Sequence, residues 1–525
     1  MPAPSSNFGA PVNIVGAVAN VPINVAQQYR DVVGRMKVSV HQNIYEADFE
    51  YGTQPLRWEA FTAGSGTITQ MPQSGGVKMS LTTAAGDVTI RQSRPYHRYQ
   101  PGKAMFMATA LNFGGTQANQ QQRVGYFDDS NGVFFLQSGA PTATNPYGMY
   151  IGYRTDVSGT PTDVIVPFDS TFSSAGWNYG GDVANQPFAA ALNWNNIQML
   201  WIEYAWYGAG QVRWGCFING QPIILHAIGF GNLTGQSVPW ARTGNLPVRY
   251  EQRNIGAVAT PNTMYHYGVS VVVEGRVDDQ RGFTYSYGMA LGTPLRTVAA
   301  ASTRYPVLSI QNRLAGTQEY TGTVASGTGG ATGTLTCSGA GWTVNQWQGR
   351  YVFYTVTSVQ YAARILSNTA TVLTLADPIL GSLGTVTAPS SGSFTIGLPN
   401  RGQLLPRFLL VSSSALAQCE LIASTPASPI VLTGASFAAL STLGAAYSFG
   451  TRDVSATAMT GGEVVMKFTL PAGGSGLQQI DLGNLFPLYN NIRGTAPDIL
   501  TLAVSTQSGV PANVGADITC QEAMS

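Results

Sequence analysis

Charged side chains are scarce in this chain. Asp, Glu, Lys and Arg make up 10% of its 525 residues, against about 25% in an ordinary soluble domain. The formal net charge is +1, so repulsion between copies is weak and a nucleic-acid partner is not expected. Of the 27 basic residues only four are lysine (Lys37, Lys78, Lys103 and Lys467). Interfaces are enriched in Arg and aromatics and depleted in Lys and Glu, so this composition predicts a subunit of an assembly; an Arg-rich genome is the alternative explanation.

The sequence also lacks cysteine pairs and long apolar runs. Cys216, Cys337, Cys419 and Cys520 form no C-x-x-C pair, so they are expected to be core residues of a protein made in a reducing cytoplasm. The most apolar stretch, residues 430–449, is interrupted by Thr and Ser, and no membrane span is expected. The N-terminus has neither the basic start nor the apolar core of a secretory signal.

Motifs for catalysis and for metal or cofactor binding are missing as well. The sequence has no P-loop, dinucleotide fingerprint or G-x-S-x-G elbow, and its histidines lack metal-ligand spacing. Glycoside cleavage needs two facing carboxylates, yet Glu203 is isolated between Trp201 and Trp206. Asp128-Asp129 is expected to lie in a hairpin turn, where Asp is favoured for local backbone hydrogen bonds. The sequence predicts a non-enzymatic protein with no metal and no cofactor.

Short strands separated by turn signals are what the sequence does contain. Residues 197–207 are dense in aromatic and β-branched side chains, which favour strands. Asn219-Gly220 separates the next two strand-like runs, as in a two-residue hairpin, and Asn131-Gly132 breaks another Tyr/Phe-rich run. Helical periodicity is nearly absent. The pattern predicts an all-β chain built on a jelly-roll or lectin-like β-sandwich.

Changes in composition divide the chain, which exceeds the roughly 250–300 residues that one core supports. Residues 1–45 are expected to form an arm, in which Asn24 caps a short helix that continues as far as Met36. This arm either packs on its own domain or reaches a neighbour. The β-sandwich is expected over residues 46–315. We expect a small inserted β-module over residues 316–398, which begin Gly/Ser/Thr-rich, and a C-terminal β-domain over residues 399–525.

The tryptophans are candidates for carbohydrate binding. Seven of the nine lie in the predicted sandwich, where most are expected to fill the core. A tryptophan exposed near a loop could instead stack on a sugar ring. Trp58, Trp177 and Trp240 are the candidates for this role.

A basic segment is the candidate for subunit contact. Residues 90–103 (IRQSRPYHRYQPGK) combine basic side chains with two tyrosines. We expect Arg91, Arg94 and Arg98 to form a contact loop between subunits. The alternatives are a solvated loop, or a site for nucleic acid or an anionic polysaccharide.

Several long motifs carry a resemblance to a known family. They are RVGYFDDSNGVFF (123–135), IQMLWIEYAWYGAGQVRWGCFINGQPI (197–223) followed by His226, NLPVRYEQRN (245–254), VLSIQNR (307–313), NRGQLLP (400–406) and LTGASF (432–437). In this order the chain resembles a family of virion structural proteins of tailed bacteriophages and some large DNA viruses. In such relatives VLSIQNR runs almost directly into NRGQLLP. The segment that intervenes here is itself similar to a small β-module common in phage structural proteins.

The resemblance implies a virion component, and the composition implies permanent contacts. We expect a non-enzymatic structural protein of a tailed-phage virion, assembled in the host cytoplasm, and most readily an external tail or fibre-attachment component. A capsid decoration protein, or a carbohydrate-binding adhesin that contacts the host surface, is the alternative. The expected partners are copies of the chain itself, other virion proteins and, for the adhesin, a host glycan. A trimer suits fibres and three-fold capsid positions, but the sequence leaves the stoichiometry open.

Overall fold

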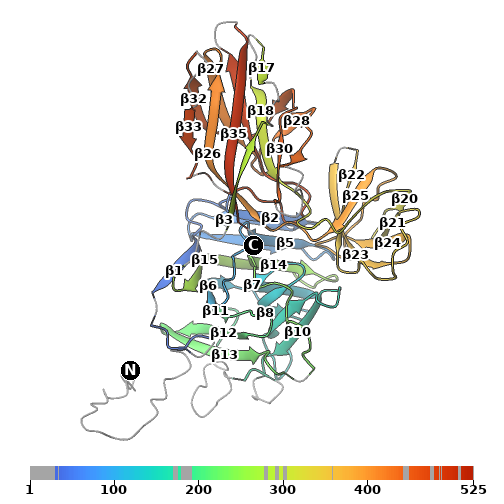
Figure 1. Cartoon of the computed structure of the whole chain (residues 1–525). Coiled ribbons are helices and arrows are strands. Elements are labelled where there is room, and N and C mark those ends of the chain that lie inside the picture. The colour runs from blue at the N-terminus through green and yellow to red at the C-terminus, as the bar shows by residue number, and fades with distance from the viewer. Residues whose placement is uncertain are drawn as a thin grey trace, which may run out of the picture.

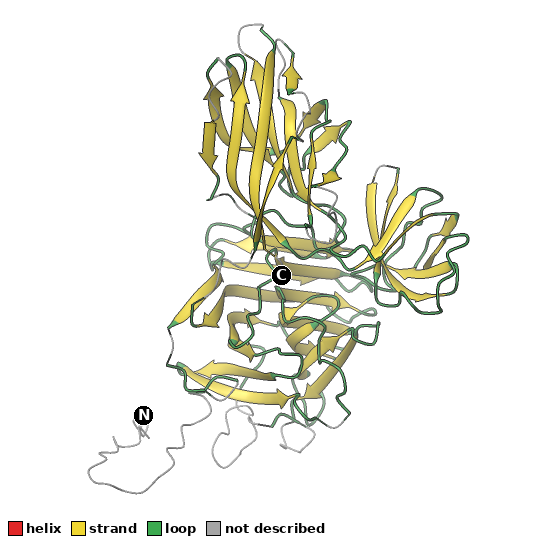
Figure 2. Ribbon diagram, viewed as in Figure 1, coloured by secondary structure: helices red, strands yellow, loops and turns green. Residues whose placement is uncertain are grey.

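The computed structural model describes residues 30–32, 35–38, 40–169, 176–178, 192–233, 235–276, 282–289, 295–299, 304–357, 359–440, 448–472, 478–483, 485, 487–506 and 510–523. Within these ranges every regular element is a β-strand, and all strand pairs within the named sheets are antiparallel (Figure 2). The predicted all-β class is confirmed. No helix in this part of the chain is long and apolar enough to cross a membrane.

The first sandwich consists of two sheets, here called sheet I and sheet II. Sheet I runs in the order β13 (Gln221–Gly229), β12 (Gln211–Ile218), β11 (Gln198–Tyr204), β6 (Met105–Asn112), β15 (Asn262–Glu274), β4 (Gly76–Leu81) and β3 (Thr67–Met71), with β1 (His41–Ala47) also paired to β15. Sheet II runs β10 (Thr162–Pro167), β9 (Met149–Thr155), β8 (Gly132–Ser138), β7 (Gln120–Phe127), β14 (Val248–Asn254), β5 (Val88–Ser93) and β2 (Trp58–Ala63).

One large core lies between these two sheets. Successive side chains of a strand point to opposite faces, so Ile202 of β11 and Tyr250 of β14 lie in the shared core, whereas Glu203 and Glu251 point away from it. The indole of Trp214 spans the core and donates a hydrogen bond to the carbonyl oxygen of Phe134 at 3.2 Å. The predicted sandwich is therefore real, and each of its sheets presents a second, outer face.

The C-terminal sandwich also has two sheets and its own core. One runs β16 (Phe283–Gly288), β35 (Ala512–Ala523), β26 (Gln403–Ser413) and β33 (Gln478–Asp481), with β17 (Arg296–Val298) paired to β35. The other runs β29 (Ala438–Ala439), β30 (Gly450–Asp453), β18 (Tyr305–Asn312), β34 (Ile499–Thr506), β27 (Ala417–Ala423) and β32 (Glu463–Leu470). A separate pair joins β28 (Val431–Thr433) to β31 (Ala458–Thr460).

The predicted boundary at residue 315 is wrong. Strands β16, β17 and β18 pair with β35 and β34 of the C-terminal sandwich, not with the first sandwich. The first sandwich ends with β15 at Glu274, and the C-terminal sandwich begins with β16 at Phe283. Strand-like sequence alone does not say which of two sheets a strand joins, because pairing is decided by long-range contacts.

The module is a separate barrel-like sheet set to one side of both sandwiches (Figure 1). Its order is β19 (Tyr320–Thr323), β25 (Ser393–Gly397), β22 (Tyr351–Val356), β23 (Val359–Asn368), β24 (Val372–Ala376), β21 (Gly333–Thr336) and β20 (Ser326–Thr328). It lies between β18 and β26, and its ends run side by side: the amide of Gly316 donates to the carbonyl oxygen of Leu398 at 2.8 Å. Such a stem allows a domain to be inserted between two strands.

Two local predictions are tested by the backbone. The Asn219-Gly220 turn has positive φ at both residues, 50° and 76°, as the two-residue hairpin requires. By contrast, Phe127 pairs with Gly132, so residues 128–131 form a longer loop and Asn131-Gly132 is not a two-residue turn.

The described residues of the predicted arm helix, 30–32 and 35–38, do not form a helix. In the described part of residues 30–38 an isolated antiparallel bridge joins Arg30 to Met36. The prediction of a helix as far as Met36 is therefore wrong. Its start at Asn24 lies outside the described residues.

We expect the module to be dispensable for folding of the two sandwiches. When residues 316–398 are deleted and Ala315 is joined to Pro399, which already form a β-bridge, the far-ultraviolet circular dichroism should remain that of a β protein. Isolated residues 316–398 should unfold cooperatively, because the module has its own core with Trp342 and Trp347. Aggregation of the shortened chain together with an unfolded isolated module would contradict this division.

Candidate functional site

The outer face of sheet II carries charged side chains that are shielded from water. Arg249 and Glu251 alternate with the core residues Val248 and Tyr250 along β14, and both are fully buried. The module and the C-terminal sandwich contact the end of this face. A buried charge is tolerated only when it is paired and hydrogen-bonded, so the arrangement of these groups decides whether the face is stable.

The charges of sheet II form one continuous network. The guanidinium of Arg249 binds Asp129 through two hydrogen bonds of 2.9 and 3.0 Å. Arg123 lies 3.1 Å from Glu251 and 2.9 Å from Asp163. Although burial acts in the opposite direction, the guanidinium groups around Glu251, those of Arg253, Arg249 and Arg123 first among them, hold the pKa of Glu251 far below its usual range.

A second set of ion pairs attaches the module to the first sandwich. Asp156, which follows β9, lies 3.0 Å from Arg242 and 3.4 Å from Arg364 of the module strand β23. Arg364 also donates to the hydroxyl of Ser130 at 2.6 Å. Burial raises the pKa of Asp156, and the two guanidinium groups oppose that rise. The module is thus held by its own arginine in a carboxylate pocket of the sandwich.

A third set attaches the C-terminal sandwich. Arg94, just after β5, binds Asp498 through two hydrogen bonds of 2.7 and 2.8 Å, and its guanidinium lies 5.7 Å from the ring centroid of Tyr489. The amide of Ile492 donates to the carboxylate of Glu59 at 2.8 Å. Both hydrogen bonds of Arg94 come from Nη2. Charge-assisted hydrogen bonds of this kind are strong, so this contact holds the C-terminal sandwich against sheet II.

The module and the C-terminal sandwich also contact each other at this point. Arg493 lies 2.7 Å from Asp377 of the module. Beside this pair, Ile379 and Ile492 pack on Val88 and Ile90. The side chains of Val88 and Ile90 project from the outer face of β5. Each of the three bodies is therefore joined to the other two, and we call the whole contact region the joint.

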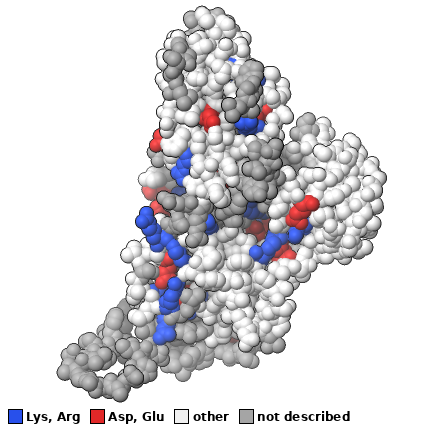
Figure 3. All heavy atoms as spheres, viewed as in Figure 1, with Lys and Arg blue, Asp and Glu red and all other residues white. Residues whose placement is uncertain are grey.

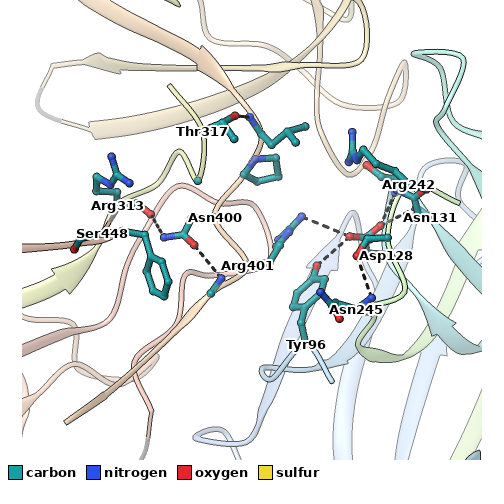
Figure 4. A pocket seen from close by; sticks show the side chains of 17 residues that line it. Tyr96, Asp128, Asn131, Arg242, Asn245, Arg313, Thr317, Asn400, Arg401 and Ser448 are labelled. Atoms are coloured by element: carbon teal, nitrogen blue, oxygen red, sulfur yellow. Dashed lines mark hydrogen bonds and ion pairs between the residues drawn. The ribbon is translucent and has the colours of Figure 1, made fainter. Parts of the chain in front are cut away.

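A cavity of about 350 Å³ opens at the joint (Figure 4). Arg401 extends into it, with its guanidinium 4.9 Å from the ring centroid of Tyr96 and 3.9 Å from Asp128. Asn400 donates to the carbonyl oxygen of Arg313 at 2.9 Å. Arg401 thus joins the C-terminal sandwich to the first sandwich across the cavity. Within the described ranges no group of three or more His, Cys, Asp or Glu could hold a metal ion.

The three tryptophans predicted to bind sugar are all buried. Trp58 is 2%, Trp177 4% and Trp240 0% exposed. Trp177 donates to the carbonyl oxygen of Val166 at 3.1 Å, and Trp240 is stacked on Phe230. A ring that is covered by protein on both faces cannot stack on a sugar, so these candidates are wrong in this structure.

The predicted contact arginines have other roles. Arg91 lies in the first sandwich, 4.9 Å from the ring centroid of Phe49 and 5.4 Å from that of Trp58. Arg94 binds Asp498 in the joint. Both are buried by their own chain, which contradicts a contact between subunits. Arg98 is half-buried, and its role stays a prediction.

Two smaller predictions are confirmed, those for Asp128 and for the cysteines. The carboxylate of Asp128 accepts hydrogen bonds from the amides of Ser130 and Asn131 at 2.8 and 2.9 Å, as a turn residue does. His226 is a satisfied sheet residue, since its Nδ1 accepts the amide of Asn178 at 3.0 Å, and burial lowers its pKa to about 4. All four cysteines are free and buried.

Sequence reasoning named Arg94 and Asp128-Asp129 in other roles and missed the remaining residues of the joint, although one signal was readable. Arg249, Glu251 and Arg253 occupy every second position of β14, where they alternate with Val248, Tyr250 and Gln252. Alternating charge on a strand commonly indicates a solvated face. The distant partners, such as Arg364 and Asp498, carry no local signal.

Comparisons with known proteins give only distant likenesses. No family model and no curated protein matches the chain. Among solved structures, an apo Crh5 transglycosylase is 16% identical with a TM-score of 0.27, covering 44% of this chain and 84% of its own. An endo-1,3-β-glucanase from Streptomyces sioyaensis is 8% identical with a TM-score of 0.29 (45% and 97% covered). The Emp47p carbohydrate recognition domain is 10% identical with a TM-score of 0.28 (45% and 97%). Scores this low say nothing of what this chain does.

Replacing Arg94 should loosen the joint. Arg94→Ala leaves Asp498 buried without its ion partner, and breaking one side of a buried pair costs about 3–5 kcal/mol. We expect a lower free energy of unfolding in urea and faster proteolysis between the two sandwiches. Arg304→Ala is the matched control: Arg304 pairs with Glu420 on the surface, where a pair contributes only about 0–1 kcal/mol. Equal effects of the two substitutions would contradict a joint held by Arg94.

Stability should also depend on pH through Glu59. Burial raises the pKa of Glu59 to about 7 from an ordinary 4.5, and the hydrogen bond from Ile492 opposes that rise. The folded state therefore binds this proton more tightly than the unfolded state, so the free energy of unfolding falls as pH rises through this window. Glu59→Gln should remove this part of the fall in urea titrations at several pH values. Glu463→Gln, an exposed position, should not.

Proposed function

We propose that this protein is a non-enzymatic structural subunit on the outside of a tailed-phage virion and that it works as a homo-oligomer. The observation that carries the proposal is where the few charges lie. Several buried ion pairs, such as those of Arg249 and Arg94, lie in or beside the joint. Figure 3 shows that most of the surface on the face it presents is uncharged. Such a surface favours permanent contacts with neighbours over free solution.

Exposed apolar side chains support the same proposal. They occur on both sandwiches and on the module. Examples are Ile197 (57% exposed), Phe283 (70%), Val344 (67%) and Val431 (60%). Single exposed apolar residues are common, but here they stand on a surface with little charge between them. Copies of the chain or other virion proteins would cover them in an assembly.

The resemblance adds a link between the family landmarks and the joint. RVGYFDD supplies Arg123 and Asp129, and NLPVRYEQRN supplies Arg249 and Glu251. These residues hold the buried network.

Our first choice of location is the tail or its fibre and attachment apparatus, with capsid decoration second. A joint that fixes three β-bodies suits a component that must keep its shape in a particle.

Sedimentation velocity and cryo-electron microscopy test the proposal. The purified chain should associate at micromolar concentration, because obligate subunit contacts commonly bury over about 2,000 Å². Its density should lie on the outside of an intact phage particle. A chain that stays monomeric at high concentration and depolymerises polysaccharide would overturn the structural role.

A further inference from the structure

Sheet I carries a cleft on its outer face, away from the joint. Its floor comes from neighbouring strands, because Glu203 of β11 pairs with Phe106 of β6 on one side and with Arg213 of β12 on the other. Side chains directly opposite each other in a sheet share a face. The cleft measures about 360 Å³, which lies within the size range of small-molecule sites. The proposed structural role does not use it.

The floor of the cleft is aromatic. The rings of Phe106 and Trp201 are stacked, with centroids 5.7 Å apart and an angle of 26° between their planes. Phe217 packs beside them and is half-buried. Opposite Trp201 stands Gly215, where an added Cβ would lie 2.1 Å from the indole. The sheet therefore leaves room at this point for the indole to lie across it.

A carboxylate in the cleft has an unused acceptor. Glu203 is 2% exposed. Its Oε1 lies 3.1 Å from Lys37, and its Oε2 lies 3.8 Å from Arg213, beyond hydrogen-bond reach. Oε2 has no hydrogen-bond partner in the described part of the chain. A buried acceptor without a donor is costly, and a ligand hydroxyl would supply that donor.

The charges around the cleft are balanced. Lys37 and Arg213 face Glu203, and Arg35 lies 3.5 Å from Glu274 at one end. Arg35 also pairs with Asp31 at 2.6 Å. Three cationic and three anionic side chains therefore meet here. A charged ligand would gain little from this field and would compete with existing pairs.

The segment before β1 forms one wall. The carbonyl oxygen of Arg30 accepts a hydrogen bond from Arg213 at 2.8 Å. Lys37 lies 5.7 Å from the centroid of the Phe106 ring. Val32 packs on Ala104 and Ala205. This wall turns a flat sheet face into a bounded cleft, which a ligand needs in order to bury most of its surface.

We propose that this cleft binds a neutral saccharide. The apolar face of a sugar ring would lie on the half-buried rings of Phe106 and Phe217, while Trp201, which is only 3% exposed, supports Phe106 from within the sheet. A sugar hydroxyl would donate to Oε2 of Glu203. An apolar molecule would leave that oxygen without a donor. An acidic or basic molecule would disturb the charge balance. The site is independent of the proposed virion role, since a structural subunit with or without a glycan ligand would assemble in the same way.

A glycan array followed by calorimetry tests the site on the full chain. The array holds neutral α- and β-linked oligosaccharides of glucose, mannose, galactose and N-acetylglucosamine, together with sialylated and sulfated ones. We expect binding to one neutral class. Phe217→Ala and Glu203→Gln should each weaken that binding roughly tenfold or more. Phe283→Ala, at an exposed aromatic position on the C-terminal sandwich, should leave it unchanged.

Trp201→Phe supplies a second measurement. This substitution keeps an aromatic ring in the floor, so the fold should survive, and thermal unfolding checks this. The change of tryptophan fluorescence on adding the neutral glycan should be smaller in the variant than in the wild type. Wild-type protein that binds no neutral oligosaccharide, that binds only acidic ones, or whose binding survives both Phe217→Ala and Glu203→Gln would overturn the proposal. Sedimentation of the same variants reports on assembly separately.

Discussion

The architecture of this protein depends on the pairing of buried arginines with carboxylates on the outer face of sheet II. A β-sandwich normally gives its outer faces to water. Here Arg249, Glu251 and Arg123 remain charged while excluded from solvent. That state is stable only because each charge meets an opposite one at hydrogen-bond distance. The pairs of Arg364 with Asp156 and of Arg94 with Asp498 extend the same principle to the module and to the C-terminal sandwich.

The joint and the cleft use the two outer faces of one sandwich in different ways. On sheet II the charges are paired with one another and with other domains. On sheet I the aromatic rings of Phe106 and Trp201 border a carboxylate that retains an acceptor. The first arrangement favours a fixed shape, and the second favours a small polar ligand. Both follow from which residues occupy alternate positions of adjacent strands.

Strand content, the hairpin at Asn219-Gly220 and the inserted module follow from local sequence, because turn chemistry and side-chain alternation act over a few residues. The domain to which β16 belongs does not follow from local sequence, because the partner strand β35 lies more than 200 positions away along the chain. The candidate site was harder to predict from the sequence than the fold. Trp58 and Trp240 are residues of the type that stacks on sugar rings, but whether each is exposed depends on which parts of the chain pack over it. Glu203 looks isolated in sequence, yet it acquires Lys37 and Arg213 from other parts of the chain.

The alternation of charge on β14 has a consequence for synthesis. The first sandwich is complete at Glu274, whereas Arg364 and Asp498 are made later. Domains generally fold as units in the order of synthesis, so sheet II must wait for its cover. During that interval Arg249, Glu251 and Arg253 favour hydration of this face, whereas the apolar Val88 and Ile90 beside them stay uncovered until Ile379 and Ile492 are made. The side chains that pair in the finished molecule thus also set how strongly the half-made one attracts other nascent chains.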